Sequence, residues 1–465
     1  MVQAAELPRN ETGIATVISV LKQQLGDRLQ TGQSIREQHA HTTTWIDNQP
    51  PDAVVFPQSA QEVSDIVKIC ATHDVPVIPF GTGTSLEGHV NAPAGGICMD
   101  LMQMNKVVAV HASDLSCVVQ PGVTREDINT HLRDQGLFFP IDPGANASLG
   151  GMAATGASGT NAVRYGTMKD NVLALEAVMA DGRVIRTAQR AKKTSAGYDL
   201  TRLLVGSEGT LGVITEITLR LQGIPEAISS ARCSFPSVDA ACQATMQVIQ
   251  YGIPVARIEL LDELQVKAVN AYSKLDLPEE PLLLLEFHGS EAGVAEQAEM
   301  FGAIAEEHGG SGYVFTTVAE ERTKLWQARH DGYWASLQLR PGAQGISTDV
   351  CVPISRLADC VNAARERLDA DGLMSPIVGH VGDGNFHCLL LIDENDQEEM
   401  DKAAAFVSWL SELAISMDGT CTGEHGIGQG KMPYLRKELG EATDFMQAIK
   451  IALDPQGILN PGKVV

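Results

Sequence analysis

Hydrophobic positions near the N-terminus follow a helical spacing. A helix over residues 12–25 would place four apolar side chains on one face: Ile14, Val17, Ile18 and Leu21. After Trp45 the apolar runs become short and alternate with polar segments. We expect strands at residues 53–56, 75–79, 96–101, 106–110 and 115–119, and helices at 60–73 and 127–135. Ser59, with Glu62 three residues later, is typical of a helix N-terminus.

The chain of 465 residues is too long for one hydrophobic core, because such cores stop growing at roughly 250–300 residues. The run Gln222-Gly-Ile-Pro-Glu226 interrupts the strand pattern and indicates a domain boundary. Helices and strands alternate again over residues 227–420. We therefore expect two domains.

Charge and cysteine content narrow the class of protein. The net charge is −24 and no basic run is longer than Arg190–Lys193, which argues against nucleic-acid binding. None of the nine cysteines forms a Cys-x-x-Cys pair, which favours reduced thiols. Reduced thiols indicate a cytoplasmic location, and peripheral association with the inner face of a membrane is compatible with it. Because no 18 apolar residues run together, we expect no transmembrane segment.

Two loops are rich in small residues, at 80–88 and 143–166. Such loops let backbone N–H groups converge on a phosphate, and the second has no Lys or Arg between Asp142 and Val163. Neither loop matches the Gly-x-Gly-x-x-Gly dinucleotide fingerprint or the P-loop. The loops predict a nucleotide site, and a flexible linker at 143–166 is the alternative.

Two histidines flank an Asp-Gly pair in the second half. If Asp383-Gly384 is a two-residue hairpin turn, His380 pairs with His387 across the ladder, which would form a two-ligand metal site. Two hydrogen-bonded histidines near a turn are the alternative. Glu424 lies in a glycine-rich loop, either as a further ligand or on a solvated surface.

Several motifs, in order, resemble a known family. Ala53–Pro57, Pro79–Gly88, Pro143–Gly166 and Val205–Gly212 are similar to the FAD-binding domain of the vanillyl-alcohol oxidase superfamily. Gly379–His387 and Gly423–Gly428 resemble its branch of FAD-linked D-lactate dehydrogenases, glycolate oxidases and D-2-hydroxyglutarate dehydrogenases. Within that branch, Leu325–His330 and Ser347–Pro353 look most like the mitochondrial-type D-lactate dehydrogenases.

The resemblance implies an α+β flavoprotein with an FAD domain and a substrate (cap) domain that has a mixed or antiparallel sheet. The expected parts are an N-terminal helical segment at 1–45, a PCMH-type FAD-binding domain at 46–224, a substrate domain at 225–421, and a C-terminal segment at 422–465 that returns to the flavin site. Thr84 stands where some members attach flavin to a His, so noncovalent FAD is expected. The residues expected at the flavin are Phe80, Gly81, Thr82, Gly83, Thr84, Ser85, Pro143, Gly144, Ser148, Gly150, Gly151, Thr155, Gly156, Ser158, Gly159, Tyr165, Gly166, Glu208, Gly209, Gly212, Ile214 and Asn460.

The same resemblance implies the chemistry. A divalent metal would sit on His380, His387 and Glu424, with His425 as the base and Arg329 as the residue that binds the substrate carboxylate. Two His and a Glu suit Zn²⁺, with Mn²⁺ or Fe²⁺ as alternatives. The metal would polarise the hydroxyl of a D-2-hydroxy acid, and the electrons would leave through FAD to an external quinone, cytochrome or electron-transfer flavoprotein.

Three positions distinguish the candidate substrates. Ser347, Tyr333 and Leu389 replace the Lys, Thr and Asn that hold the distal carboxylate in the hydroxyglutarate enzymes. A short substrate such as D-lactate is therefore expected, with glycolate or D-2-hydroxyglutarate as alternatives, since an unpaired buried carboxylate is costly. From other classes, a metal-dependent hydrolase and a nucleotide-binding module without redox chemistry remain open.

Overall fold

A computed structural model describes residues 6–465, which divide into two compact units. We call residues 6–158, 166–224 and 424–465 the loop unit, and residues 159–165 and 225–423 the sheet unit. The chain thus leaves the loop unit for seven residues, 159–165, near the end of the second glycine-rich run. Each unit is described on its own.

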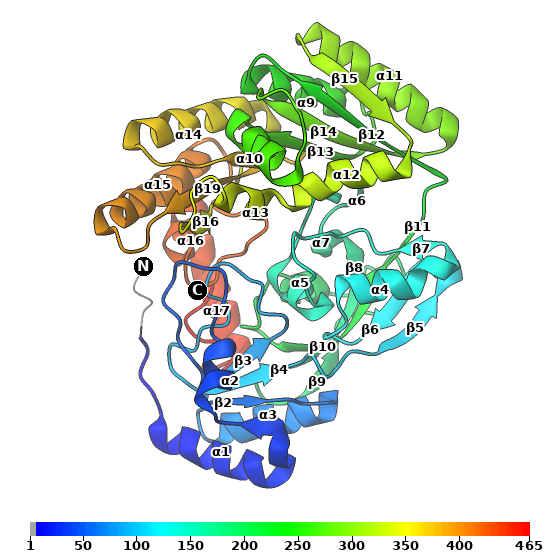
Figure 1. Ribbon diagram of the computed structural model, residues 1–465. Helices are drawn as coiled ribbons and strands as arrows, with labels where there is room; N and C mark the ends of the chain where they lie inside the picture. Colours follow the sequence, from blue (N-terminus) through cyan, green and yellow to red (C-terminus); the bar gives the residue numbers. More distant parts are fainter. Residues whose placement is uncertain (1–5) are drawn as a thin grey trace. The chain divides into compact units, whose positions relative to one another are not determined.

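The loop unit contains two larger sheets (Figure 1). The first has the order β1-β2-β4-β3, and its last three strands are parallel: β1 Leu29–Gln30, β2 Ala53–Val55, β4 Ile97–Asp100 and β3 Val77–Phe80. Helices α1 (Glu11–Leu25) and α3 (Ala60–Thr72) share its hydrophobic core through Val17, Leu21 and Ile66. This core explains the periodic apolar face of α1.

The second sheet is antiparallel, in the order β5 Val107–His111, β6 Ser116–Val119, β10 Val213–Arg220, β8 Val172–Val178 and β9 Val184–Arg186. Short β7 (Leu137–Phe138) and β11 (Gln222–Gly223) pair separately. The remaining helices of the loop unit are α2 Gln33–Gln38, α4 Arg125–Leu132, α5 Leu149–Thr155, α7 Met168–Asn171, α8 Leu200–Leu204, α16 Met432–Leu439 and α17 Ala442–Leu453. After α17 the tail runs beside β3, with Leu459 bridging Val77 in parallel.

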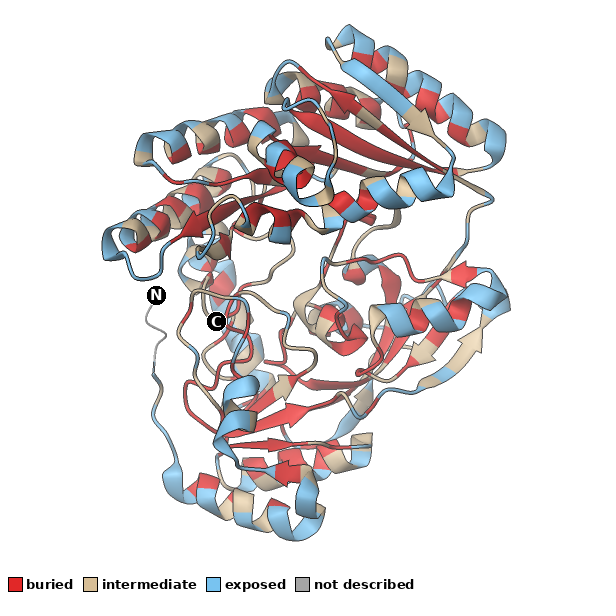
Figure 2. Cartoon of the chain, in the orientation of Figure 1, coloured by how far each residue is buried: buried red, intermediate tan, exposed pale blue. Residues whose placement is uncertain are grey.

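The sheet unit is built on eight antiparallel strands, seven of them in the order β15-β12-β14-β13-β18-β19-β16, while β17 pairs with β19 off this path. Their bounds are β12 Ala227–Ser234, β13 Val255–Leu261, β14 Leu282–Gly289, β15 Ser311–Thr316, β16 Gln344–Ser347, β17 Val350–Cys351, β18 Ile377–His380 and β19 Asn385–Ile392. Figure 2 shows the central strands buried along their length and the helices exposed on their outer faces.

The helices of the sheet unit are α6 Ala162–Tyr165, α9 Val238–Gln250, α10 Glu263–Ser273, α11 Glu291–Glu307, α12 Ala319–His330, α13 Gly332–Leu337, α14 Leu357–Asp371 and α15 Gln397–Ser416. Helices α10, α12 and α13 share a hydrophobic core with one face of β13 and β14, through Val266, Trp326, Ala335, Leu261 and Leu284. This face also carries the polar residues of the candidate site, because side chains two residues apart on a strand point the same way.

Several expectations are confirmed and one boundary differs. Ser59 caps α3 by accepting the backbone N–H of Glu62, although the Glu62 side chain binds Arg28 and the Gln58 N–H. The helix-like run at 326–338 is two helices that meet at Asp331. Across residues 6–465, none of the nine cysteines is in a disulfide, and no helix is long and apolar enough to cross a membrane.

Candidate active site

The two glycine-rich loops meet inside the loop unit. The Ser148 N–H donates to the Thr82 hydroxyl over 3.4 Å, and a Cβ on Gly81 would lie 2.3 Å from Ser148 Oγ. A side chain at position 81 would therefore displace the Ser148 hydroxyl. The run from 143 is not a linker, because Ser148 caps α5 and Gly156 ends this helix in the left-handed conformation.

The segment Val205–Gly212 lies against the same helix. The backbone N–H groups of Gly206 and Glu208 donate to the carbonyls of Ala153 and Ala154, and Gly209 lies against Pro79. Three predicted flavin-binding segments of the loop unit, at 80–85, 148–156 and 206–212, therefore gather around α5.

A buried polar cluster joins the C-terminal tail to these loops. Glu208 pairs with His89 (3.1 Å) and accepts the N–H groups of Ile427 and Gly428. Burial alone would raise the pKa of Glu208, but His89 and the two N–H groups outweigh burial and lower it. Asn460 donates to the carbonyls of Glu208 and His89.

The residues present fit a bound phosphate. Among residues 6–465, the buried Ser85 hydroxyl in the first loop has no hydrogen-bond partner from the protein, and a buried hydroxyl normally has one. A ligand oxygen at the loop would supply that partner. Thr84, next to it, is hydrogen-bonded to Thr82.

Two of the predicted flavin residues, Gly159 and Tyr165, belong to the sheet unit. The Tyr165 hydroxyl lies 2.7 Å from His288 Nδ1, and Asn161 accepts from Arg257 Nε at 2.9 Å. Segment 159–165 is therefore anchored by side chains to β13 and β14 (residue 161 to β13, residue 165 to β14).

The expected two-residue turn between the histidines is wrong. His380 pairs with Asn385, and His387 pairs with Val378, so four residues form the turn. The turn is drawn toward β17: the Val352 N–H donates to the Gly384 carbonyl, and Gly384 leaves no room for a Cβ, which would lie 2.0 Å from Val352 O. The register differs from the predicted one by two residues, so both histidines remain on one face of the sheet. They are diagonal neighbours across the two strands, with ring centroids 5.4 Å apart.

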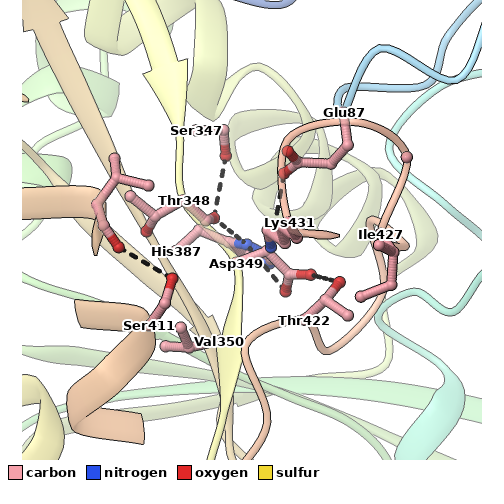
Figure 3. A network of polar contacts seen from close by, with 12 residues as sticks. Glu87, Ser347, Thr348, Asp349, Val350, His387, Ser411, Thr422, Ile427 and Lys431 are labelled. Atoms are coloured by element: carbon pink, nitrogen blue, oxygen red, sulfur yellow. Dashed lines mark hydrogen bonds and ion pairs between the residues drawn. The ribbon is translucent and has the colours of Figure 1, made fainter. Parts of the chain in front are cut away.

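Hydrogen bonds fix the orientation of both rings. His380 Nδ1 lies 2.7 Å from Glu259 Oε1, and His387 Nδ1 lies 2.9 Å from the Thr348 carbonyl (Figure 3 shows His387 beside Thr348). Both oxygens can only accept, so each Nδ1 carries the hydrogen and each Nε2 carries the lone pair. A carboxylate or carbonyl behind the ring is the usual support of a metal-binding histidine, so this pair fits a divalent metal.

Glu259 also holds Arg329. Its Oε2 accepts from Arg329 Nε at 2.9 Å and Nη2 at 2.7 Å, and its side chain is fully buried. Burial would raise the pKa of Glu259, but His380 and Arg329 outweigh burial and lower it. Arg329 is thus not a solvated helix-surface residue, since its side chain is only 15% exposed.

The chain segment before Glu424 is docked on the same sheet. Asp349 accepts from Asn385 Nδ2 at 2.7 Å. It also accepts from the Thr422 hydroxyl at 2.8 Å (Figure 3). A Cβ on Gly423 would lie 2.2 Å from Asn385 Nδ2, so a larger residue here would have to displace the Asn385 amide from Asp349. Glu424 and His425 follow directly, as the first residues of the last segment of the loop unit.

The three predicted specificity residues lie together. Ser347 pairs with Leu389 across β16 and β19, and the Tyr333 ring and Leu389 both flank Gly345. Leu389 shares its face of β19 with His387. Sequence patterns did not identify Glu259 or Asp349. The signal for Glu259 was a carboxylate inside the mainly apolar run Val255–Leu261.

Comparison with known proteins identifies the class. Residues 224–464 match the model of the C-terminal domain of FAD-linked oxidases, and residues 51–188 match an FAD-binding domain. The chain therefore belongs to the family of FAD-linked oxidases and is an FAD-dependent oxidoreductase. This result favours the flavin enzyme over the hydrolase and the nucleotide-binding module.

Its relatives include enzymes whose names state a substrate. The chain is 50% identical to "Probable D-lactate dehydrogenase, mitochondrial" of Danio rerio, over 97% of this chain and 92% of the relative. It is 47% identical to "D-lactate dehydrogenase [cytochrome], mitochondrial" of Arabidopsis thaliana, over 97% and 80%. It is 36% identical to the "Glycolate oxidase subunit GlcD" of Bacillus subtilis, over 89% of each.

Solved structures support the fold alone. A 4-ethylphenol oxidase from Gulosibacter chungangensis matches with a TM-score of 0.81 at 18% identity, over 99% of this chain and 98% of that chain. p-Cresol methylhydroxylase matches with a TM-score of 0.78 at 16% identity, over 99% and 98%. Both agree with the expected vanillyl-alcohol oxidase type of fold.

The predicted cytoplasmic location is contradicted by these comparisons. Four D-lactate dehydrogenase relatives, at 38–50% identity, are named as mitochondrial. The prediction relied on unpaired cysteines, which report a reducing environment and do not distinguish one reducing compartment from another.

Proposed function

We propose that the protein oxidises a small D-2-hydroxy acid, preferably D-lactate, to the 2-oxo acid and passes the electrons to a separate acceptor. One observation carries this proposal: a single face of the sheet unit presents Arg329, His380 and His387 together with the uncharged Ser347 and Leu389. The names of the relatives support the same substrate. Their word "cytochrome" favours a cytochrome over a quinone or an electron-transfer flavoprotein as acceptor.

The bound groups would supply the redox step. When bound, FAD accepts hydride from the substrate carbon and a divalent metal polarises the substrate hydroxyl. His380 and His387 would hold the metal through Nε2, with Glu424 as the third ligand. Gly423 lies against Asn385, and one peptide bond joins Gly423 to Glu424. This position supports Glu424 as the third metal ligand. Zn²⁺ is the preferred ion, with Mn²⁺ or Fe²⁺ as alternatives.

The chain itself orients the substrate and takes its proton. Arg329 has five N–H donors, of which Glu259 engages two, so donors remain for a substrate carboxylate. His425 would accept the hydroxyl proton at a ring nitrogen, since an imidazole suits proton transfer at neutral pH. Tyr333 and Leu389 would exclude water from the side of the substrate's short alkyl group.

The loop unit would hold FAD without a covalent bond. Phosphate oxygens would accept hydrogen bonds from backbone N–H groups of segments 80–85 and 148–156, and from the Ser85 hydroxyl. Thr84 has no nucleophilic nitrogen for attachment to the flavin. Acid precipitation should release all the flavin into the supernatant, and yellow colour that stays with the pellet would contradict this part of the proposal.

A substrate panel with an artificial dye as acceptor tests the function. We expect D-lactate to give the highest kcat/KM, L-lactate to give none, and glycolate to be weaker because it lacks the methyl group that contacts an apolar wall. A panel in which D-2-hydroxyglutarate or glycolate surpasses D-lactate would overturn the substrate assignment.

A further inference from the structure

One buried carboxylate contacts two residues of the proposed site. Glu259 lies on β13, where Leu260 pairs with Gly379, and this register brings Glu259 beside His380. Helix α12 packs on the same face and brings Arg329 to the other oxygen of the carboxylate. One fully buried group therefore touches both a proposed metal ligand and the proposed substrate-binding Arg.

We propose that Glu259 is a positioning residue that couples metal binding to substrate binding; the inference rests on the proposed function of His380 and Arg329. Glu259 Oε1 accepts the Nδ1 hydrogen of His380 and so keeps the lone pair on Nε2, the atom that binds the metal. Glu259 Oε2 fixes the guanidinium edge of Arg329 through Nε and Nη2. The two oxygens of this one carboxylate therefore set the distance between the metal ligand His380 and the substrate-binding Arg329.

The charge of Glu259 serves both partners. Both neighbours present N–H donors, so both oxygens must be acceptors, and a neutral amide of the same shape supplies only one. In Glu259→Gln, the NH₂ group meets either the Arg329 N–H groups or the His380 Nδ1–H. The first arrangement displaces Arg329, and the second forces the hydrogen of His380 onto Nε2, where it blocks metal binding.

The sheet unit offers a matched control. Glu286 on β14 is also buried, and its Oε1 lies 2.8 Å from His288 Nε2 and 3.5 Å from Arg257 Nε. It has the same kinds of neighbours but touches neither His380 nor Arg329. Glu286→Gln therefore removes a comparable charge from the same sheet.

The test measures Zn²⁺ affinity of the flavin-loaded full chain by competition with a chelator, and separates kcat from KM for D-lactate. We expect Glu259→Gln to weaken Zn²⁺ binding about 10–100-fold, as other supports of metal-binding histidines do, and to raise KM about tenfold. Glu286→Gln should change each value less than twofold. Wild-type affinity and KM in Glu259→Gln, or equal losses in Glu286→Gln, would overturn the proposal.

A second variant covers a failure of Glu259→Gln to fold. Glu259→Asp keeps the charge but is one methylene too short to span both partners, so it should show smaller losses in the same two measurements. Unchanged values in Glu259→Asp would also count against the proposal. Because the Zn²⁺ titration needs no turnover, a wild-type protein that binds Zn²⁺ but does not oxidise D-lactate would refute the proposed substrate, while the support of His380 by Glu259 would still be tested by Zn²⁺ affinity.

Discussion

Two clusters in the sheet unit have the same composition and different surroundings. The site cluster is Arg329, Glu259 and His380; the scaffold cluster is Arg257, Glu286 and His288. They occupy neighbouring strands, since Arg257 pairs directly with Glu286 and Glu259 pairs with Leu284. Both carboxylates are buried, and the pKa of each is lowered because its partners outweigh the effect of burial.

The histidine tautomers separate the two clusters. In the site cluster Glu259 holds His380 through Nδ1, which leaves the lone pair on Nε2, and the neighbouring ring is His387. In the scaffold cluster Glu286 holds His288 through Nε2, and the lone pair on Nδ1 accepts the Tyr165 hydroxyl. Under the proposed function, the two clusters differ in what the second nitrogen of the histidine serves: a metal in the site cluster, and the Tyr165 hydroxyl in the scaffold cluster.

Removing the histidine of each cluster should give the largest difference. His380→Ala should abolish metal binding and lower kcat for D-lactate about a thousandfold, because metal polarisation contributes several kcal/mol to the transition state. His288→Ala should keep metal content within about threefold and should lower kcat far less than His380→Ala, because His288 contacts Tyr165 and not the proposed metal. Metal analysis and steady-state kinetics of both variants check this, and a His380→Ala enzyme with substantial activity would remove the distinction between the clusters.

Replacing the arginine of each cluster should give the next largest difference. Arg329→Met should raise KM for D-lactate about 10–100-fold, because charge-assisted hydrogen bonds contribute about 1.5–3 kcal/mol each. Arg257→Met should leave KM unchanged. Both variants leave a buried carboxylate without its cation, so both should lower Tm. Equal KM effects in the two variants would contradict the assignment of Arg329 to substrate binding.

A new cation at position 347, opposite Leu389, would sharpen the comparison. The wild-type protein should prefer D-lactate over D-2-hydroxyglutarate at least about a hundredfold in kcat/KM, because an unpaired distal carboxylate costs several kcal/mol. Ser347→Lys should narrow this ratio about tenfold, whereas Ser347→Ala should not. If Ser347→Lys leaves the ratio unchanged, Ser347 does not line the pocket.

The scaffold cluster should show its effect in acid stability. The pKa of Glu286 is lowered from 4.5, despite burial, by the His288 hydrogen bond and Arg257. Its contribution to stability is therefore present above pH 4.5 and is lost as the pH falls through the folded-state pKa. Glu286→Gln should be less stable than wild type by about 1–3 kcal/mol at pH 7, and the difference should shrink below pH 4.5. Chemical denaturation across this pH range measures the difference in stability. A difference that grows in acid would contradict the predicted pH dependence.

The sequence identified the parts of the site better than their spacing. The periodicity of residues 14–21 and the cap at Ser59 depend on local interactions, and the structure confirms both. The turn between His380 and His387 was predicted incorrectly because its conformation depends on β17, which lies 30 residues earlier in the chain. Glu259 could not be assigned from sequence, since its partners are 70 and 121 residues away.

Reduction of the bound flavin under anaerobic conditions tests the central claim most directly. D-Lactate added to the metal-replete protein, with no acceptor present, should bleach the visible flavin absorbance in proportion to the amount added and yield pyruvate. L-Lactate should leave the spectrum unchanged. A flavin that stays oxidised in the presence of excess D-lactate would contradict the proposed reaction.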